Sequence, residues 1–237
     1  MRAAYERLTS ILSDPDECGM SALDCIYEIM ENEMQRRDSN ALARRLKEAK
    51  ICLPNARPDT IDFSIERGLD KNKIDALLTM RWMEEHQNII ITGAAGCGKT
   101  FLACALVNQA CIKGRTARVV RVPLLLNQMA ASHQIVETYF KKLKEMKTID
   151  LLVLDDWGIG QLDARSRQDL LEIINERYMY ASTIVTSVLP VNKWSEYIND
   201  TTYSDAILDR LVSVSHRVEL NGASVRQMKE YGAVLKE

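Results

Sequence analysis

Residues 91–100 read ITGAAGCGKT, in which three glycines precede a lysine and a threonine. The stretch matches the pattern GxxxxGK followed by serine or threonine, and it lies between an apolar run and a helical pattern. Glycines let the backbone bend until its N–H groups converge on phosphate oxygens, and the helix start adds the positive end of its dipole. We therefore expect a phosphate-binding loop formed by Gly93, Ala94, Ala95, Gly96, Cys97, Gly98, Lys99, Thr100 and Phe101.

The polar residues that close this loop predict its ligand. Lys99 would neutralise the β and γ phosphates of a nucleoside triphosphate, and the hydroxyl of Thr100 would coordinate Mg²⁺. The alternative is a glycine turn that arises by chance. The flanking strand and helix are the context that the motif requires, so we favour a nucleotide site.

A second polar cluster ends the stretch LLVLDDWG at residues 151–158. A strand that ends beside the phosphate loop would place Asp155 where it can hold Mg²⁺, usually through water. Asp156 would then accept a hydrogen bond from the attacking water and align it with the γ-phosphorus. The alternative is a charged strand end that faces solvent.

Short apolar runs alternate with helical patterns from about residue 58 onward. The runs are near-continuous, as expected for a parallel sheet with helices on both faces, so the sequence predicts an α/β fold with five parallel strands. The expected strands are 88–92, 117–122, 151–155, 182–187 and 216–220, and the expected helices are 99–113, 124–146, 164–179, 191–198 and 203–212. Because strand 117–122 lies between the loop and the acids in sequence, we expect another strand between them in the sheet as well. This order resembles the additional-strand ATPases more than the small-molecule kinases.

The N-terminal part predicts a small helical domain at 1–57, joined to an ATPase domain at 58–237 through a proline-containing linker at 53–62. Apolar residues recur at helical spacing within residues 20–50. Candidate caps of a second helical segment are Asp38, Ser39 and Asn40. We expect the apolar stripe to pack within the chain, with docking of a protein partner as the alternative; its residues are Leu23, Ile26, Tyr27, Met30 and Met34.

Two basic segments could contact DNA phosphates. Residues 34–57 hold seven bases and two acids, and residues 140–147 read FKKLKEMK. The candidate DNA-binding residues are Arg44, Arg45, Lys47, Lys141, Lys142 and Lys144, and the alternative for each segment is a solvated helix face. The chain has no apolar stretch of about 18 residues and no charged-then-apolar leader, which predicts a cytoplasmic protein without membrane contact.

Several motifs together resemble a known family. Beside the phosphate loop and LLVLDDWG, the stretches TIVTSVLPVNKW at 183–194, DAILDRLV at 205–212 and HRVELNGASVR at 216–226 resemble IstB-like transposition helper ATPases. These are relatives of the DnaC helicase loader in the AAA+ superfamily. The resemblance implies a P-loop sheet of the AAA+ (ASCE) type and hydrolysis of ATP with Mg²⁺.

The resemblance also implies roles for polar residues that follow the acids. Ser187 resembles the polar sensor that helps to place the attacking water, with Thr186 as the alternative. Arg210 looks like an arginine finger that would reach the γ-phosphate of a neighbouring subunit, and its alternative is a surface residue paired with Asp205 or Asp209. Arg226 resembles the second sensor.

The sequence departs from the family pattern at some points. The second acid is usually glutamate, so Asp156 predicts slow hydrolysis or a need for assembly to tighten the geometry. Position 188 is valine where relatives often carry a polar residue. Only 17 residues follow the fifth expected strand, which predicts a reduced or absent C-terminal lid. The start, MRAAYERL, looks as if it begins part-way into the family's N-terminal helix.

The leading functional hypothesis is an ATP-dependent regulator of transposition. It would form a homo-oligomer on duplex DNA without reading its sequence, and it would deliver this target DNA to the transposase of the same element. ATP would act mainly as an assembly ligand, and hydrolysis would release the assembly. The alternatives are a DnaC-like replicative helicase loader and a small-molecule kinase.

Overall fold

A five-stranded parallel sheet forms the centre of the described part of the chain. The computed structural model describes residues 5–6, 8–10, 22–222 and 224–225. The strands run in the order β2-β3-β4-β1-β5. Their bounds are β1 Asn88–Gly93, β2 Ala117–Arg121, β3 Leu151–Trp157, β4 Ser182–Ser187 and β5 Ser215–Leu220. The predicted α/β fold and its five strands are confirmed.

The strand that separates the loop from the acids is not the one that the sequence order suggested. The loop follows β1 and the acids lie in β3, and β4 lies between these two strands. The prediction of an intervening strand is confirmed. However, residues 117–122 form the edge strand β2, so the intervening strand comes from a later part of the chain.

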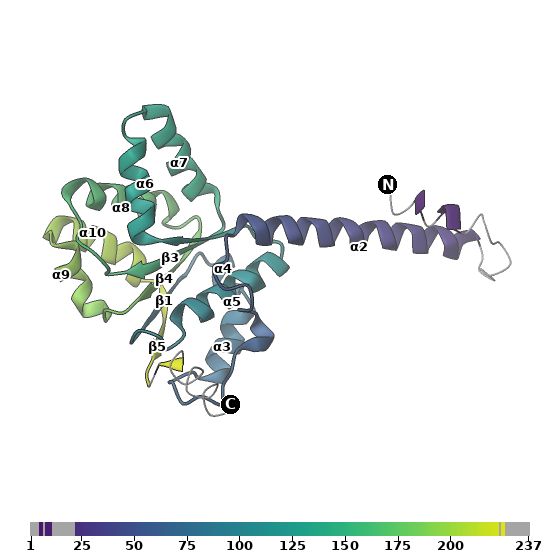
Figure 1. The fold of residues 1–237 in the computed structure, drawn as a ribbon, viewed down its shortest axis with the longest axis horizontal. Coiled ribbons are helices and arrows are strands. Elements are labelled where there is room, and N and C mark those ends of the chain that lie inside the picture. The colour runs from purple at the N-terminus through teal and green to yellow at the C-terminus, as the bar shows by residue number, and fades with distance from the viewer. Residues whose placement is uncertain (1–4, 7, 11–21, 223, 226–237) are drawn as a thin grey trace, which may run out of the picture.

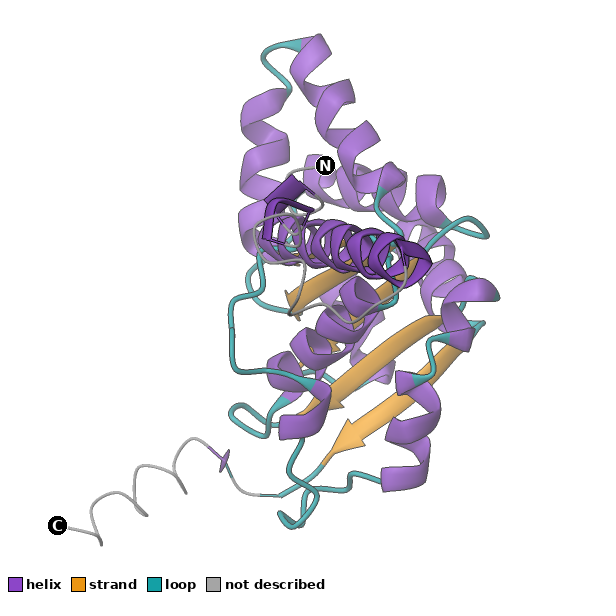
Figure 2. Ribbon diagram, turned by 90° about the vertical axis from the view of Figure 1, so that its right-hand side faces the viewer, coloured by secondary structure: helices purple, strands orange, loops and turns teal. Residues whose placement is uncertain are grey.

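Helices cover both faces of the sheet (Figure 1; Figure 2). The strands therefore alternate between two apolar clusters, with Ile89 and Ile91 on the α5 side and Ile90 on the other. This burial on both faces explains the near-continuous apolar runs. The helices are α2 Ala22–Glu48, η1 Pro58–Thr60, α3 Lys71–Leu78, α4 Arg81–Glu84, α5 Lys99–Ile112, α6 Val122–Ser132, α7 Val136–Thr148, α8 Ala164–Arg177, η2 Val191–Lys193, α9 Trp194–Ile198 and α10 Thr201–Val212. None of them, within the described residues, is long and apolar enough to cross a membrane.

The single helix expected at 124–146 is two helices. The chain breaks after α6, and Ile135 is extended where α7 begins. At the break, the ring of His133 stacks on Tyr139, and its Nε2 lies 2.8 Å from the carboxylate of Asp169 on α8. These contacts orient the α6–α7 hairpin, which rises above the sheet (Figure 1).

The N-terminal helix α2 is continuous, so the expected caps Asp38, Ser39 and Asn40 lie inside it and begin no second helix. Its C-terminal part packs on the apolar core beside the sheet, through Leu42 and Leu46. The rest projects away from the sheet (Figure 1). The apolar stripe Leu23, Ile26, Tyr27, Met30 and Met34 is 56–71% exposed, so the expectation that it packs within the chain is wrong.

The linker after α2 crosses the core. The carbonyl of Ala49 accepts a hydrogen bond from the N–H of Val119 on β2 at 2.9 Å, and Ala56 is fully buried beside α5. The linker is thus part of the packed structure on this side of the sheet. The domain boundary at residues 57 and 58 and the reduced lid remain predictions, since residues 226–237 lie outside the described part.

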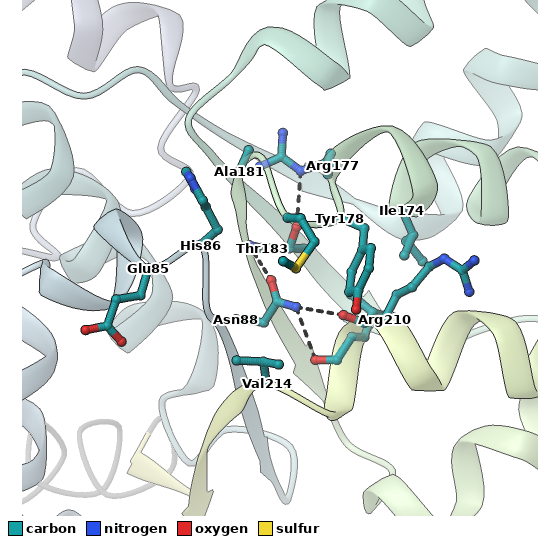
Figure 3. Close-up of a pocket in the computed structure, with 12 residues that line it drawn as sticks. Glu85, His86, Asn88, Ile174, Arg177, Tyr178, Ala181, Thr183, Arg210 and Val214 are labelled. Atoms are coloured by element: carbon teal, nitrogen blue, oxygen red, sulfur yellow. Dashed lines mark hydrogen bonds between the residues drawn. The ribbon is translucent and has the colours of Figure 1, made fainter.

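A buried cation joins α8 to its neighbours. The guanidinium of Arg177, 2% exposed, donates to the carbonyls of Met146, Ile149 and Ser182 and to the hydroxyl of Thr183. Figure 3 shows its bond to Thr183. Burial lowers the pKa of Arg177 to about 9. Because this one side chain bonds to groups from α7, the residue after it and β4, removal of Arg177 would take a donor from four buried or partly buried oxygens.

We expect Arg177→Met to lower the free energy of unfolding by about 3 kcal/mol, because it removes a buried cation together with the four hydrogen bonds that it donates. Urea denaturation followed by circular dichroism measures the change. Arg165→Met, at an exposed position of the same helix, is the control. A loss no larger than that of the control would show that the network does not stabilise the fold.

Candidate functional site

The phosphate-binding loop lies between β1 and α5, and its backbone requires glycine. Gly93 and Gly98 have φ angles of 147° and 100°, which side-chain-bearing residues rarely adopt. A Cβ atom at Gly93 would lie 2.2 Å from the carbonyl oxygen of Leu220, and one at Gly98 would lie 2.4 Å from a guanidinium nitrogen of Arg67. The glycines are thus required both by the backbone conformation and by the close approach of Leu220 on β5 and of Arg67.

The lysine of the motif reaches back over this loop. Its Nζ donates to the carbonyls of Gly93 at 2.9 Å and Ala94 at 2.7 Å, and the residue is only 9% exposed. The structure therefore places the ammonium of Lys99 inside the loop. This is the position from which a cation can contact phosphate oxygens bound there.

The loop and the first acid of β3 meet directly. The hydroxyl of Thr100 donates to Oδ1 of Asp155 at 2.9 Å, and the hydroxyl of Thr186 on β4 donates to the same oxygen. Asp155 is 4% exposed. A hydroxyl and a carboxylate are hard oxygen ligands of the kind that Mg²⁺ prefers, and the ion commonly keeps several waters and substrate phosphates as its other ligands. Thr100 and Asp155 therefore fit a magnesium site.

The second acid has an unusual backbone. Asp156 lies in the left-handed region with φ 61°, where the pairing of β3 with β4 shifts register between Leu154 and Trp157. Its side chain accepts a hydrogen bond from Nε of Arg121 at 2.6 Å, and its N–H donates to the hydroxyl of Thr186 at 3.3 Å. The bulge turns Asp156 away from its neighbour Asp155, so the two carboxylates have different partners.

Arg121 is a residue that the sequence reasoning missed. It ends β2 and pairs in register with Asp155 of β3, which brings its side chain to the same edge of the sheet as the acids. Contact with Asp156 raises the pKa of Arg121, first through the hydrogen bond and then through charge attraction. The one available signal was an arginine at the end of an apolar strand in a sheet that carries its polar site at the strand ends.

The two sensor candidates have different surroundings. The hydroxyl of Ser187 donates to the carbonyl of Trp157 at 2.7 Å and accepts from the N–H of Leu189 at 3.0 Å, so it is occupied by backbone. The hydroxyl of Thr186 donates to the carboxylate of Asp155 and accepts from the backbone N–H of Asp156. The geometry favours the alternative, Thr186, as the polar residue that reaches the acids, and the sensor role itself stays a prediction.

A cavity of about 360 Å³ opens beside the phosphate loop. Its size is in the range of small-molecule sites. One wall comes from residues 53–67, between α2 and α3, which the sequence reasoning did not identify. There Arg67, 5% exposed, donates to the carbonyls of Cys97 and Asp62, and burial lowers its pKa. The cavity is lined by Leu53, Thr60, Asp62, Ile65, Arg67, Gly96, Gly98, Lys99, Thr100, Phe101 and Val225.

Arg210 lies near the N-terminal ends of the strands, whereas the loop lies at their C-terminal ends. Its carbonyl accepts a hydrogen bond at 3.1 Å from the side chain of Asn88, which begins β1 (Figure 3). Gly93 ends that strand at the loop. The guanidinium of Arg210 lies 5.7 Å from the ring centroid of Tyr178 and donates to the carbonyl of Ala206.

Within residues 22–222, no ion pair joins Arg210 to Asp205 or Asp209, so the surface pairing considered from the sequence is absent there. Arg226 lies outside the described residues.

The two basic segments approach each other at a second cavity, of about 450 Å³, which is lined in part by Lys50, Arg118, Arg121 and Lys142. Arg44 and Lys47 are exposed at the end of α2, whereas Nε of Arg45 donates to the carbonyl of Cys111 and so has a structural contact. On α7, Lys141 and Lys144 are exposed, and Lys142 bonds to Gln128 at 3.4 Å. Of the predicted DNA-binding residues, Lys142 lines this cavity, and Lys50 lines it from the segment that follows α2.

Comparison with known proteins agrees with this site. A family model described as "IstB-like ATP binding protein" matches residues 1–233. A putative insertion sequence ATP-binding protein of Sinorhizobium fredii is 39% identical over 92% of this chain and 89% of its own length.

Solved structures share the fold. The DnaC helicase loader has a TM-score of 0.56 at 21% identity, covering 71% of this chain and 98% of its own. The AMPPCP-bound DnaA of Aquifex aeolicus has a TM-score of 0.59 at 22% identity, covering 78% of this chain and 56% of its own.

We expect Lys99→Ala to weaken ATP binding by at least about 30-fold, since it removes a charge-assisted contact worth roughly 2 kcal/mol. Fluorescence titration with a labelled ATP analogue measures the affinity. Lys113→Ala, at an exposed position just beyond the same helix, should leave it unchanged. Equal affinities for ATP in the two variants would show that Lys99 of the loop does not contribute to ATP binding.

We expect Arg121→Ala to raise the kcat of ATP hydrolysis up to about fivefold, because the ion pair that holds Asp156 in the resting arrangement is largely exposed and therefore weak. A steady-state phosphate-release assay measures the rate. Arg115→Ala, exposed before the same strand, is the control. A fall in kcat would instead show that Arg121 assists hydrolysis directly.

Proposed function

The chain belongs to the IstB-like ATP-binding family, and from this premise we propose that it is an ATP-dependent regulator that assembles on duplex DNA and delivers that DNA to a transposase. It is an ATPase of the AAA+ type. The relative from Sinorhizobium fredii is an insertion-sequence ATP-binding protein, which supports a role in transposition.

The observation that carries the proposal is the hydrogen bond between Thr100 of the phosphate loop and Asp155 of β3, with Asp156 as the next residue of that strand. The loop N–H groups and the ammonium of Lys99 would bind the β and γ phosphates. Asp156 would accept a hydrogen bond from water and align its oxygen with the γ-phosphorus. To do so its carboxylate must give up the bond to Arg121.

Magnesium would be held by Thr100 and Asp155 and would neutralise the negative charge that builds up on the phosphate oxygens. The hydroxyl of Thr186 helps to orient the carboxylate of Asp155 towards this position. Support of this kind matters because a metal ligand must keep its direction as substrate arrives and product leaves.

The position of Arg210 supports assembly. It lies near the N-terminal end of β1, and the phosphate loop follows the C-terminal end of the same strand. This arginine is therefore remote from the site of its own chain. Only the site of a second copy is then within its reach. Tyr178 would hold the guanidinium in place through the contact between cation and ring. Nucleotide binding and subunit contact would become one event.

Two further surfaces suit the proposed partners. Lys50, which follows α2, and Lys142 of α7 line the same basic cavity, and such a surface can neutralise backbone phosphates of duplex DNA without reading bases. The exposed apolar stripe on the projecting part of α2 is available for a protein partner, which we propose to be the transposase.

The second candidate is a helicase loader, which would use the same ATPase fold on a different client. The likeness to DnaC supports the fold alone at this level of identity. The insertion-sequence relatives cover nearly the whole chain at higher identity, and they favour the transposition role.

Electron microscopy with Mg-ATP and long duplex DNA tests the proposal. We expect regular DNA-bound oligomers for the wild type, and for Arg210→Ala we expect loss of at least about 100-fold of the ATPase rate of the assembled state, since a finger in trans stabilises transition-state charge. Arg217→Ala, exposed on β5, is the matched control.

Two results would contradict the proposal: wild-type protein that stays unassembled on DNA with Mg-ATP, and an ATPase rate in Arg210→Ala equal to that of the control. The variant Tyr178→Phe should retain most of the activity because it keeps the ring, whereas Tyr178→Leu should lose part of it.

A further inference from the structure

Two cysteines from distant parts of the chain lie side by side next to the nucleotide site. The sulfur atoms of Cys52 and Cys104 are 3.7 Å apart, although the residues are 52 positions apart in sequence. Cys52 belongs to the linker that follows α2. Cys104 lies on α5, one helical turn after Thr100 of the phosphate loop.

The two thiols differ in access to solvent. Cys52 is exposed and lines the 450 Å³ cavity together with cationic side chains, among them Lys50 and Arg121. Cys104 is fully buried, and burial raises its pKa to about 12, so it remains a thiol at neutral pH. An oxidant dissolved in water therefore reaches Cys52 first, and the negative charge that develops on its attacking sulfur faces nearby cations.

We propose that Cys52 and Cys104 are a redox-sensitive pair whose disulfide ties the linker to the phosphate-loop helix. A peroxide supplies the oxidising equivalents. The sulfur of Cys52 attacks one peroxide oxygen, the O–O bond breaks, and water leaves, which gives a sulfenic acid on Cys52. The sulfur of Cys104 then attacks that sulfur, the S–O bond breaks, and a second water carries away the thiol proton. The two thiols together lose two electrons and two protons.

The geometry allows this bond with small movements. A disulfide needs a sulfur separation of about 2.0 Å, so the two atoms must approach by less than two ångströms from their present distance. Cys52 lies in a non-helical segment between α2 and η1, where side-chain and backbone adjustments are inexpensive. The helical partner Cys104 can stay in place.

The cross-link would restrain one wall of the nucleotide cavity. Leu53 follows Cys52 directly and lines that cavity together with Phe101 of α5. Fixing the linker to α5 limits the local opening through which a nucleotide enters and leaves. The inference depends on ATP binding alone and is independent of DNA and transposase.

Peptide mapping tests the pair. After treatment with hydrogen peroxide and digestion with trypsin without reductant, we expect a disulfide between peptides 51–67 and 100–113, reversed by dithiothreitol. Peptide 100–113 also contains Cys111, another buried cysteine of α5, so Cys111→Ala is the matched control. The link should persist in that variant and disappear in Cys104→Ala and Cys52→Ser. Its absence in the wild type, or its survival in Cys104→Ala, would overturn the proposal.

Nucleotide exchange tests the restraint. Release of a fluorescent ADP analogue should slow by at least about twofold on oxidation of the wild type and recover with reductant, because opening of the linker wall is hindered. Cys52→Ser, exposed and therefore tolerant of change, should show no effect of peroxide. An unchanged release rate in fully cross-linked protein would overturn the restraint, and a slowing that Cys52→Ser shares would assign it to another site.

Discussion

The hydrogen bond from Thr100 to Asp155 is the contact on which the rest of the site depends. It joins the first turn of α5 to the end of β3, across the strand that separates β3 from β1. Two strand spacings, about 10 Å, lie between the loop strand and the acid strand. Thr186 from the intervening β4 donates to the carboxylate of Asp155 and accepts from the backbone N–H of Asp156.

Much of this arrangement could be predicted because its causes are local. Strands buried on both faces leave continuous apolar runs, and a loop that must admit phosphate needs glycines at backbone angles that other residues avoid. The ends of parallel strands lie at one edge of the sheet, so an acid that directly follows LLVL is placed at the site by its position alone. Asp155 and the loop were therefore readable from the sequence.

The remaining features depend on contacts that no short motif contains. Helical periodicity in α2 shows that its apolar residues share a face, but it cannot show what covers that face, and in the described structure the stripe is exposed. The bond between Arg121 and Asp156 depends on a β-bulge and on the pairing of β2 with β3. The linker wall of the cavity comes from residues with no nucleotide signature, and they are placed there by packing against α5.

The two arginines suggest how a single chain and an assembly would differ. In the structure, Arg121 donates a hydrogen bond to the carboxylate of Asp156. Arg210 lies near the N-terminal end of β1, at the opposite end of this strand from the loop. In the proposed assembly, a neighbour's Arg210 would add a second positive charge at the γ-phosphate beside that of Lys99. The shorter side chain of Asp156 makes water placement demanding, so hydrolysis by a lone subunit would be slow on two counts. ATP could then persist as the ligand that holds subunits together until assembly completes the site.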